Sequence, residues 1–171
     1  MKSKREKYRK AVFIVVYRKE NIRKSKISGA TKFKKKKNFV GNKIKYLILK
    51  RKLHWRGWEF PKGGKKILEG DEKAVRREIF EETGEIPFNI KKFNIIGRYK
   101  YSKKLADRKD FAGQTYRLYS AEIKNEKIKI DRVEHSSCKW VNFKEATRKL
   151  TYNNQRKCLK IVNSYLLNEG N

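Results

Sequence analysis

The sequence has few cysteines, few acidic residues and no long apolar run. Its two cysteines, Cys138 and Cys158, have no CxxC partner and no nearby histidine pair, which argues against a disulfide framework and against a structural zinc site. No segment approaches the roughly 18 apolar residues of a membrane span, and the first ten residues lack an apolar signal core. We therefore expect a cytoplasmic protein without a membrane partner, in which both cysteines have structural roles.

Acidic residues are scarce relative to basic ones. The chain has 18 Asp and Glu against 48 Lys and Arg, which gives a formal net charge of +30. Residues 1–45 are the most basic part, with 18 Lys and Arg and two acidic residues. Such an excess favours polyanionic partners, namely nucleic acid such as RNA, nucleotide phosphates or anionic surfaces, but lysine can also serve solubility alone. The sequence leaves both interpretations of the basic N-terminal segment open.

The length of 171 residues predicts one domain. We expect a basic tail over residues 1–9, followed by a single domain over 10–171 that carries a basic insertion at about 18–42. The sequence does not set the oligomeric state, and a monomer is the default expectation.

Apolar runs and turn residues predict a mixed α/β order of elements. Strands are expected at 11–17, 43–50, 58–60, 91–101, 115–123 and 139–141, and helices at 72–83, 143–150 and 153–167. The first strand is apolar throughout, which suits burial on both faces, and the second should pair back on it. Asp71 is the expected N-cap of the first helix and Gly84 its stop, while Asn142 is expected to cap the second helix. Residues 62–70 and 102–114 are predicted loops.

The first predicted helix carries an unusual concentration of carboxylates. Seven of the 18 acidic residues lie between positions 69 and 85. Glu78, Glu81 and Glu82 have the spacing of one helical face, whereas Val75 and Ile79 suit a contact with the core. Carboxylates so close together repel one another unless a cation lies between them, and Mg²⁺ prefers such oxygen ligands. The alternative is a solvated face whose acids pair with nearby lysines.

The residues around this face add further chemistry. Arg77 lies four positions before Glu81, so its planar guanidinium can hold that carboxylate in a fixed orientation. Before the helix, Gly63 and Gly64 let the backbone approach a ligand closely, and Lys62 can meet a phosphate. A loop that leads into a helix N-terminus also favours anions. Together these features predict metal-assisted attack of water on a phosphoanhydride.

The pattern from Gly63 to Gly84 resembles the Nudix box. Gly63 is followed by five residues and Glu69, then by seven residues and Arg77-Glu78-Ile79-Phe80-Glu81-Glu82-Thr83-Gly84. Every charged position of the box is filled. The pattern departs at its last position, where Glu85 stands in place of a bulky aliphatic residue and Ile86 follows one residue later.

This resemblance covers about residues 10–167 and implies an α/β/α sandwich with a mixed β-sheet. It implies an enzyme that hydrolyses phosphoanhydride bonds, with Mg²⁺ as cofactor and Mn²⁺ as a substitute. By the family pattern, Glu78 and Glu82 bind metal, and Glu81 belongs to the same metal site, which it supports together with Arg77. The backbone carbonyl of Lys62 completes the coordination.

Flanking residues resemble one branch of that family. Trp58-Glu59-Phe60-Pro61-Lys62-Gly63 is similar to the entry segment of diadenosine polyphosphate hydrolases, diphosphoinositol polyphosphate hydrolases and mRNA-decapping enzymes, and Glu134-His135 followed by Trp140 resembles a dinucleoside tetraphosphatase segment. The resemblance implies that Glu134 lies at the metal site, where it binds metal or positions water. The simpler alternative is that Glu134 caps a loop.

Candidate substrate residues follow from the same resemblance. Lys62, Gly63, His54 and Lys100 are candidates for phosphate binding. Tyr116 and Tyr152 are candidates for stacking on a base, although aromatic residues more often belong to the core.

The leading hypothesis is a Mg²⁺-dependent hydrolase of a dinucleoside polyphosphate such as diadenosine tetraphosphate. Either a box glutamate or Glu134 would activate the water. The alternatives are an RNA 5′-end pyrophosphohydrolase or decapping enzyme, a non-catalytic RNA-binding protein, and a hydrolase of diphosphoinositol polyphosphates.

Overall fold

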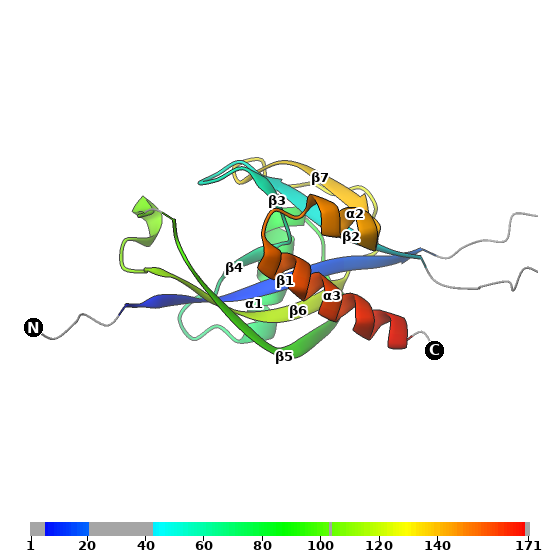
Figure 1. The fold of residues 1–171 in the computed structure, drawn as a ribbon, viewed down its shortest axis with the longest axis horizontal. Coiled ribbons are helices and arrows are strands. Elements are labelled where there is room, and N and C mark those ends of the chain that lie inside the picture. The colour runs from blue at the N-terminus through cyan, green and yellow to red at the C-terminus, as the bar shows by residue number, and fades with distance from the viewer. Residues whose placement is uncertain (1–5, 21–42, 103, 170–171) are drawn as a thin grey trace, which may run out of the picture.

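The computed structural model describes residues 6–20, 43–102 and 104–169. Their order is four strands, a helix, a strand, a short 3₁₀ turn, two strands and two helices (Figure 1). The elements are β1 Tyr8–Glu20, β2 Lys43–Arg51, β3 Gly57–Glu59, β4 Lys62–Gly64, α1 Asp71–Thr83, β5 Phe88–Lys100, η1 Ala106–Arg108, β6 Gly113–Glu122, β7 His135–Val141, α2 Phe143–Lys149 and α3 Asn153–Asn168.

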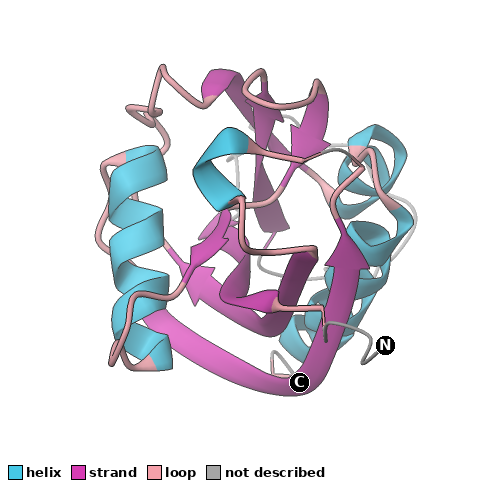
Figure 2. Ribbon diagram, turned by 90° about the vertical axis from the view of Figure 1, so that its left-hand side faces the viewer, coloured by secondary structure: helices cyan, strands magenta, loops and turns pink. Residues whose placement is uncertain are grey.

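The strands form one mixed sheet with the order β3-β2-β1-β6-β5, in which β4 also pairs with β1 and β7 with β2. The central pair, β1 and β6, is parallel, and the other pairs are antiparallel. Helices cover both faces of the sheet (Figure 2), so the predicted α/β/α sandwich is confirmed. None of the helices in the described ranges is long and apolar enough to cross a membrane.

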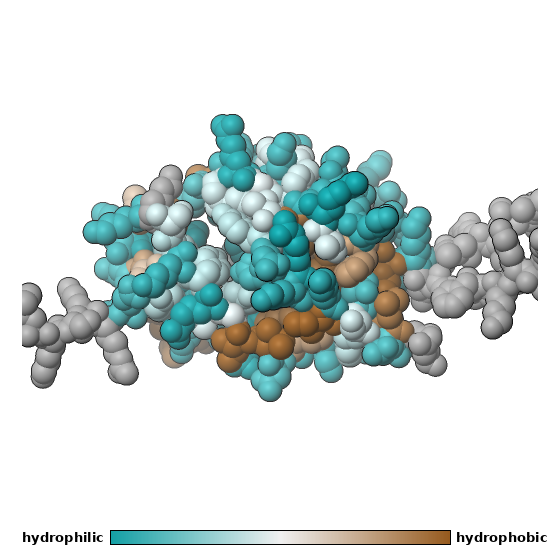
Figure 3. Space-filling view, viewed as in Figure 1, coloured by the Kyte–Doolittle hydropathy of each residue, from teal (hydrophilic) through white to brown (hydrophobic). Residues whose placement is uncertain are grey.

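β1 runs through the middle of the fold and supplies two cores, because successive side chains point to opposite faces. Phe13 and Val15 join the core under α2 and α3, whereas Val12 and Ile14 join the core under α1. All of Ala11–Tyr17 is buried, as the continuous apolar run predicts. The space-filling view is mostly hydrophilic, and its hydrophobic side chains gather near the place where β5 passes α3 (Figure 3).

Helix α1 shows the two faces that the sequence predicts. Val75 and Ile79 are fully buried in the core beneath it. Gly84 ends the helix in a left-handed conformation with φ of 72°, and its N–H donates to the carbonyl of Phe80 at 2.8 Å. The predicted cap of α2 is also present, since the Asn142 side chain accepts from the Glu145 N–H at 2.9 Å.

Two local predictions near the box are wrong. Residues 62–64 are not a loop but form strand β4, which pairs with Ala11–Phe13 of β1. Asp71 is not the N-cap of α1, because Gly70 occupies that position and Asp71 begins the helix. The Asp71 carboxylate instead accepts from the Tyr119 hydroxyl at 2.6 Å and pairs with Lys65.

Several strands are longer than the sequence predicts. β1 continues to Glu20, so residues 18–20 of the expected insertion belong to a strand, where they pair with Lys43, Ile44 and Lys45 of β2. The rest of that insertion, residues 21–42, lies outside the described residues, as do residues 1–5 of the expected tail. β7 begins at His135 instead of residue 139, and this extension brings the predicted Glu134–His135 segment to the end of a strand in the sheet.

Candidate active site

Arg77 binds three glutamates of the box, Glu69, Glu78 and Glu81. Its guanidinium binds both Glu69 oxygens at 2.8 Å, and its Nη1 donates to Glu78 at 2.7 Å and to Glu81 at 2.9 Å. Nη2 also donates to the carbonyl of Gly64 at 2.9 Å. One planar fork thus ties the loop, strand β4 and helix α1 together, which a lysine could not do. Hydrogen bonding by Arg77 lowers the pKa of Glu69 to about 2.

Gly63 has a steric reason to be glycine. A Cβ atom at this position would overlap the Glu78 carboxylate, which lies directly against the backbone of β4. A Cβ at Gly64 would likewise overlap the guanidinium of Arg9. The two glycines therefore let one carboxylate and one guanidinium lie against the strand, and both Glu78 and Arg9 line the cleft above it.

A second cluster of charges is buried beside the box. Glu59 is fully buried, and its carboxylate contacts Arg51 at 3.2 Å and Lys62. Arg51, only 5% exposed, also pairs with Glu134 at 2.6 Å. His135 is fully buried, with its Nε2 3.5 Å from Glu59. Four different segments of the chain contribute to this cluster, so it forms only when β2, β3, β4 and β7 have assembled.

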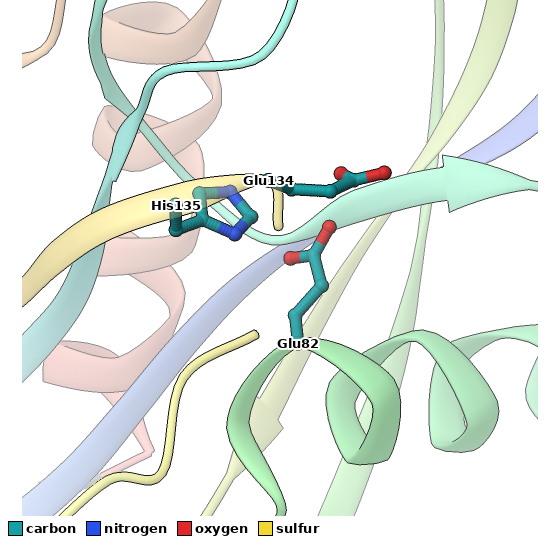
Figure 4. A group of neighbouring side chains, drawn as sticks. All are labelled: Glu82, Glu134 and His135. Atoms are coloured by element: carbon teal, nitrogen blue, oxygen red, sulfur yellow. The ribbon is translucent and has the colours of Figure 1, made fainter. Parts of the chain in front are cut away.

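Three side chains of this region have the arrangement of metal ligands. Glu82, Glu134 and His135 each offer one donor atom, and these atoms all lie within 4.8 Å of one another (Figure 4). Glu82 comes from the last turn of α1, Glu134 directly precedes β7, and His135 begins it. Glu82 is 5% exposed and lies below the cleft surface, whereas Glu134 lines the cleft.

Burial changes the pKa values of these groups. It raises the pKa of Glu78, and it raises the pKa of Glu82 well above its ordinary value. Burial and the charge of Arg51 lower the pKa of Lys62 below its ordinary value, and they lower the pKa of His135 to about 4. The imidazole of His135 is therefore neutral at pH 7, and the two glutamates are pushed towards their protonated forms unless a cation stabilises their charge.

The residues present fit a divalent cation. Three buried polar atoms have neither a hydrogen-bond partner nor a Lys or Arg ion-pair partner within the described residues: Glu82 Oε2, and Nδ1 and Nε2 of His135. Six carboxylates gather here, from residues 59, 69, 78, 81, 82 and 134. Five of them form ion pairs with Lys and Arg, through Arg51, Lys62 and Arg77 alone, and Glu82 forms none within the described residues. The negative charges thus outnumber these cations two to one. This excess favours a hard cation with oxygen ligands such as Mg²⁺.

The candidate site opens into a cleft of about 730 Å³. Basic side chains line it at several positions, namely Arg9, Lys65, Lys66, Arg98, Lys100 and Arg108. Trp55 and Tyr152 stand at one wall, with ring centroids 4.9 Å apart in an edge-to-face arrangement. The cleft therefore joins a carboxylate-rich floor to a basic and aromatic rim.

Most of the predicted substrate residues line this cleft, namely His54, Lys62, Gly63, Lys100 and Tyr152. His54 stands in a left-handed conformation with φ of 69°, and its Nε2 lies 3.5 Å from Asp107. The Lys100 ammonium is exposed and pairs with Glu6 at 2.8 Å. These positions are compatible with phosphate contacts, and the assignments stay predictions.

Tyr116 requires a correction. Its side chain is 6% exposed and packs against Phe13, with ring centroids 5.2 Å apart, and its hydroxyl lies 3.9 Å from the Cys158 sulfur. Tyr116 shares a strand face with the buried Leu118, because alternate residues of β6 point the same way. The ring is part of the core under α3, where no base can stack on it.

Sequence reasoning missed four residues of the site: Arg9, Arg51, Trp55 and Glu59. Glu59 offered a signal, since a lone carboxylate between Trp58 and Phe60 in a short strand must either face solvent or find a buried cation. Arg51 gave a weaker signal at the end of an apolar strand. Their mutual contact depends on the pairing of Leu49 with Glu59 between β2 and β3, which the sequence does not reveal.

Sequence comparison with known proteins also identifies a Nudix domain. The Nudix domain model matches residues 38–160. An RNA pyrophosphohydrolase of Nitratiruptor sp. is 30% identical over 133 residues, covering 75% of this chain and 85% of that protein. One from Shewanella loihica is 26% identical over 115 residues, covering 61% of this chain and 66% of that protein.

The fold has solved counterparts as well. The crystal structure of a C. elegans Ap4A hydrolase binary complex superposes with a TM-score of 0.67 and 20% identity, covering 94% of this chain and 98% of that one. At this identity the likeness concerns the fold. Box spacing, site geometry and the match over residues 38–160 lead to one conclusion: this chain belongs to the Nudix family.

Proposed function

We propose that this Nudix hydrolase is a divalent-metal-dependent pyrophosphohydrolase that acts on the 5′-triphosphate end of RNA. The observation that carries the proposal is the cleft, in which buried box carboxylates lie at the floor and exposed basic side chains at the rim. The curated relatives named RNA pyrophosphohydrolase and the net charge of +30 favour RNA over a small nucleotide. The dinucleoside polyphosphate that leads the sequence-based hypotheses thereby becomes the second candidate.

The chain's own groups suit a triphosphate. Lys62 and Arg51 lie beside Glu134 at the floor, where they can neutralise charge on the phosphate that is attacked. Arg9 lies over Gly64 and can bind a neighbouring phosphate. Because the buried Glu59 carboxylate holds Arg51 and Lys62 before substrate arrives, little reorganisation is required of these two cations during the reaction.

The metal site would be held by Glu78, Glu82 and Glu134, with the backbone carbonyl of Lys62 as a further oxygen ligand. When bound, the ion supplies Lewis-acid stabilisation of phosphate charge and lowers the pKa of coordinated water. Of the carboxylates at the floor, Glu81 and Glu134 have the most exposed side chains, at 51% and 32%, and both line the cleft. One of them takes the proton from the attacking water. The water oxygen would form a bond to phosphorus while the bridging P–O bond between the α- and β-phosphates breaks, so that pyrophosphate departs and the RNA keeps a 5′-monophosphate end.

One observation keeps a dinucleoside polyphosphate as the second candidate. Trp55 and Tyr152 form an aromatic corner at the cleft wall, and Tyr152 is 48% exposed. Such a surface can stack on a base at one end of a polyphosphate while the floor binds the phosphates. The same corner could equally stack on the first base of an RNA.

A substrate panel decides between the two. The wild-type chain would be assayed with Mg²⁺ on 5′-triphosphorylated RNA, capped RNA, diadenosine tetraphosphate and a diphosphoinositol polyphosphate, with product analysis and matched reactions containing a chelator. We expect the highest kcat/KM on triphosphorylated RNA, with pyrophosphate as product and no turnover in chelator. A preference for diadenosine tetraphosphate would make the second candidate the function. If none of the four substrates were hydrolysed in a metal-dependent way, both candidate functions would be contradicted.

A further inference from the structure

His135 is a fully buried imidazole whose bonding is incomplete. Its side chain has no exposed surface, and neither Nδ1 nor Nε2 has a hydrogen-bond partner among the described residues. Burying a polar group without a partner is costly, so such groups in folded proteins are nearly always bonded to something. The nearest carboxylate, that of Glu59, lies 3.5 Å from Nε2, beyond the usual range of an N–H···O hydrogen bond.

The imidazole lies beside two carboxylates. One donor atom each of Glu82, Glu134 and His135 lies within 4.8 Å of the others (Figure 4). Ligands that share one ion about 2.1 Å away lie up to about 4.2 Å apart, so small side-chain rotations would close this triangle. Glu82 Oε2 is a second buried atom without a partner in the same place, which independently indicates a missing neighbour.

Glu59 places a carboxylate beside the imidazole of His135, as is usual around metal-bound histidines. A ligating imidazole usually faces a carboxylate with its other ring nitrogen, which fixes the orientation of the ring. Glu59 faces Nε2 of His135 and is itself held by Arg51 and Lys62. The buried cluster is thus arranged to orient the imidazole.

We propose that His135 is a nitrogen ligand of the divalent cation, sharing it with Glu82 and Glu134, with Glu59 as the residue that positions the ring. This deepens the proposed function, since it concerns the metal on which that function rests. A mixed nitrogen and oxygen site favours Mn²⁺, Co²⁺ or Zn²⁺ over Mg²⁺, because those ions accept imidazole more readily.

The test is pulsed electron paramagnetic resonance on Mn²⁺ bound to tag-free protein. Nuclear modulation detects nitrogen directly bonded to Mn²⁺, and protein with ¹⁵N-labelled histidine distinguishes imidazole from other nitrogens. The chain has two histidines, His54 and His135, so each controls for the other. We expect an imidazole signal in the wild type that persists in His54→Gln and disappears in His135→Gln.

The His54→Gln protein keeps the test decisive even if His135→Gln does not fold, because any remaining imidazole signal must then come from His135. An absent histidine signal in Mn²⁺-loaded wild-type protein would overturn the proposal, as would a signal lost in His54→Gln. Mn²⁺ that fails to bind at all would overturn it too.

Affinity for the metal alone gives a second measurement. In titrations of His135→Gln, we expect affinity for Mn²⁺ to fall at least about tenfold while affinity for Mg²⁺ changes much less. Equal losses for the two ions would contradict a nitrogen ligand. Mg²⁺-dependent hydrolysis of triphosphorylated RNA by the wild type, without any histidine signal, would overturn this inference and leave the proposed function standing.

Discussion

The floor and the rim of the cleft are built in different ways. At the floor, Glu59, Glu78 and Glu82 are at most 8% exposed, and their neighbours come from several strands and a helix. At the rim, Lys66 and Lys100 are exposed and can be replaced without disturbing the core. The floor is thus fixed by the fold itself, whereas the rim is free to set which group is attached to the phosphates. The floor therefore determines the reaction, hydrolysis of a phosphoanhydride bond, and the rim determines which substrate is accepted.

The floor should be the more sensitive of the two to small steric changes. In Gly63→Ala the new methyl group would overlap the Glu78 carboxylate and displace it. Because misplacing a catalytic group by about 1 Å can cost on the order of 10²-fold in rate, we expect kcat on triphosphorylated RNA to fall by about that factor. Steady-state kinetics measure the effect.

Gly70→Ala is the matched control, because a Cβ at Gly70 meets nothing within 4 Å. Its kcat should stay near that of the wild type. If Gly63→Ala had the same kcat as Gly70→Ala, catalysis would not depend on the position of the Glu78 carboxylate against β4.

The rim should respond more weakly, and mainly in binding. Lys66 lines the cleft through an exposed side chain, so Lys66→Ala should raise KM for RNA a few-fold and lower the slope of log affinity against log salt by about one. Lys73→Ala, an exposed lysine on α1 outside the cleft lining, is the control for net charge. Equal effects of the two variants would show that only overall charge matters and not the rim.

The sequence predicted the floor residues on helix α1 but not the contacts that the strands contribute. The carboxylates of α1 are close in sequence, so helical spacing alone placed Glu78 and Glu82, and the apolar run of β1 indicated a central strand. Contacts between strands depend on register instead. The pairing that sets Gly63 beside Val12, and the one that brings Glu59 to Arg51, arise only in the assembled sheet.

At the rim, too, the sequence does not predict contacts between residues that are distant along the chain. Tyr116 and Tyr152 looked alike as isolated aromatics, yet one is in the core and the other is 48% exposed in the cleft. Alternation along β6 would have placed Tyr116 on the inward face with Leu118, and that rule was available from the sequence. The partnership of Tyr152 with Trp55 was not, because 97 positions separate these residues in a 171-residue chain and only the fold joins them.

The metal site at the floor is tested most directly by the rate at which Glu82→Gln releases pyrophosphate from 5′-triphosphorylated RNA. Glu145→Gln on α2 is the matched control. Glu82 is buried, with one oxygen lacking a partner, so its charge should serve the cation and not the surface. We expect Glu82→Gln to keep its fold by circular dichroism and to lose about 10²- to 10³-fold in kcat, while Glu145→Gln matches the wild type. A folded Glu82→Gln enzyme with a near-normal rate would contradict the assignment of the floor as the metal site.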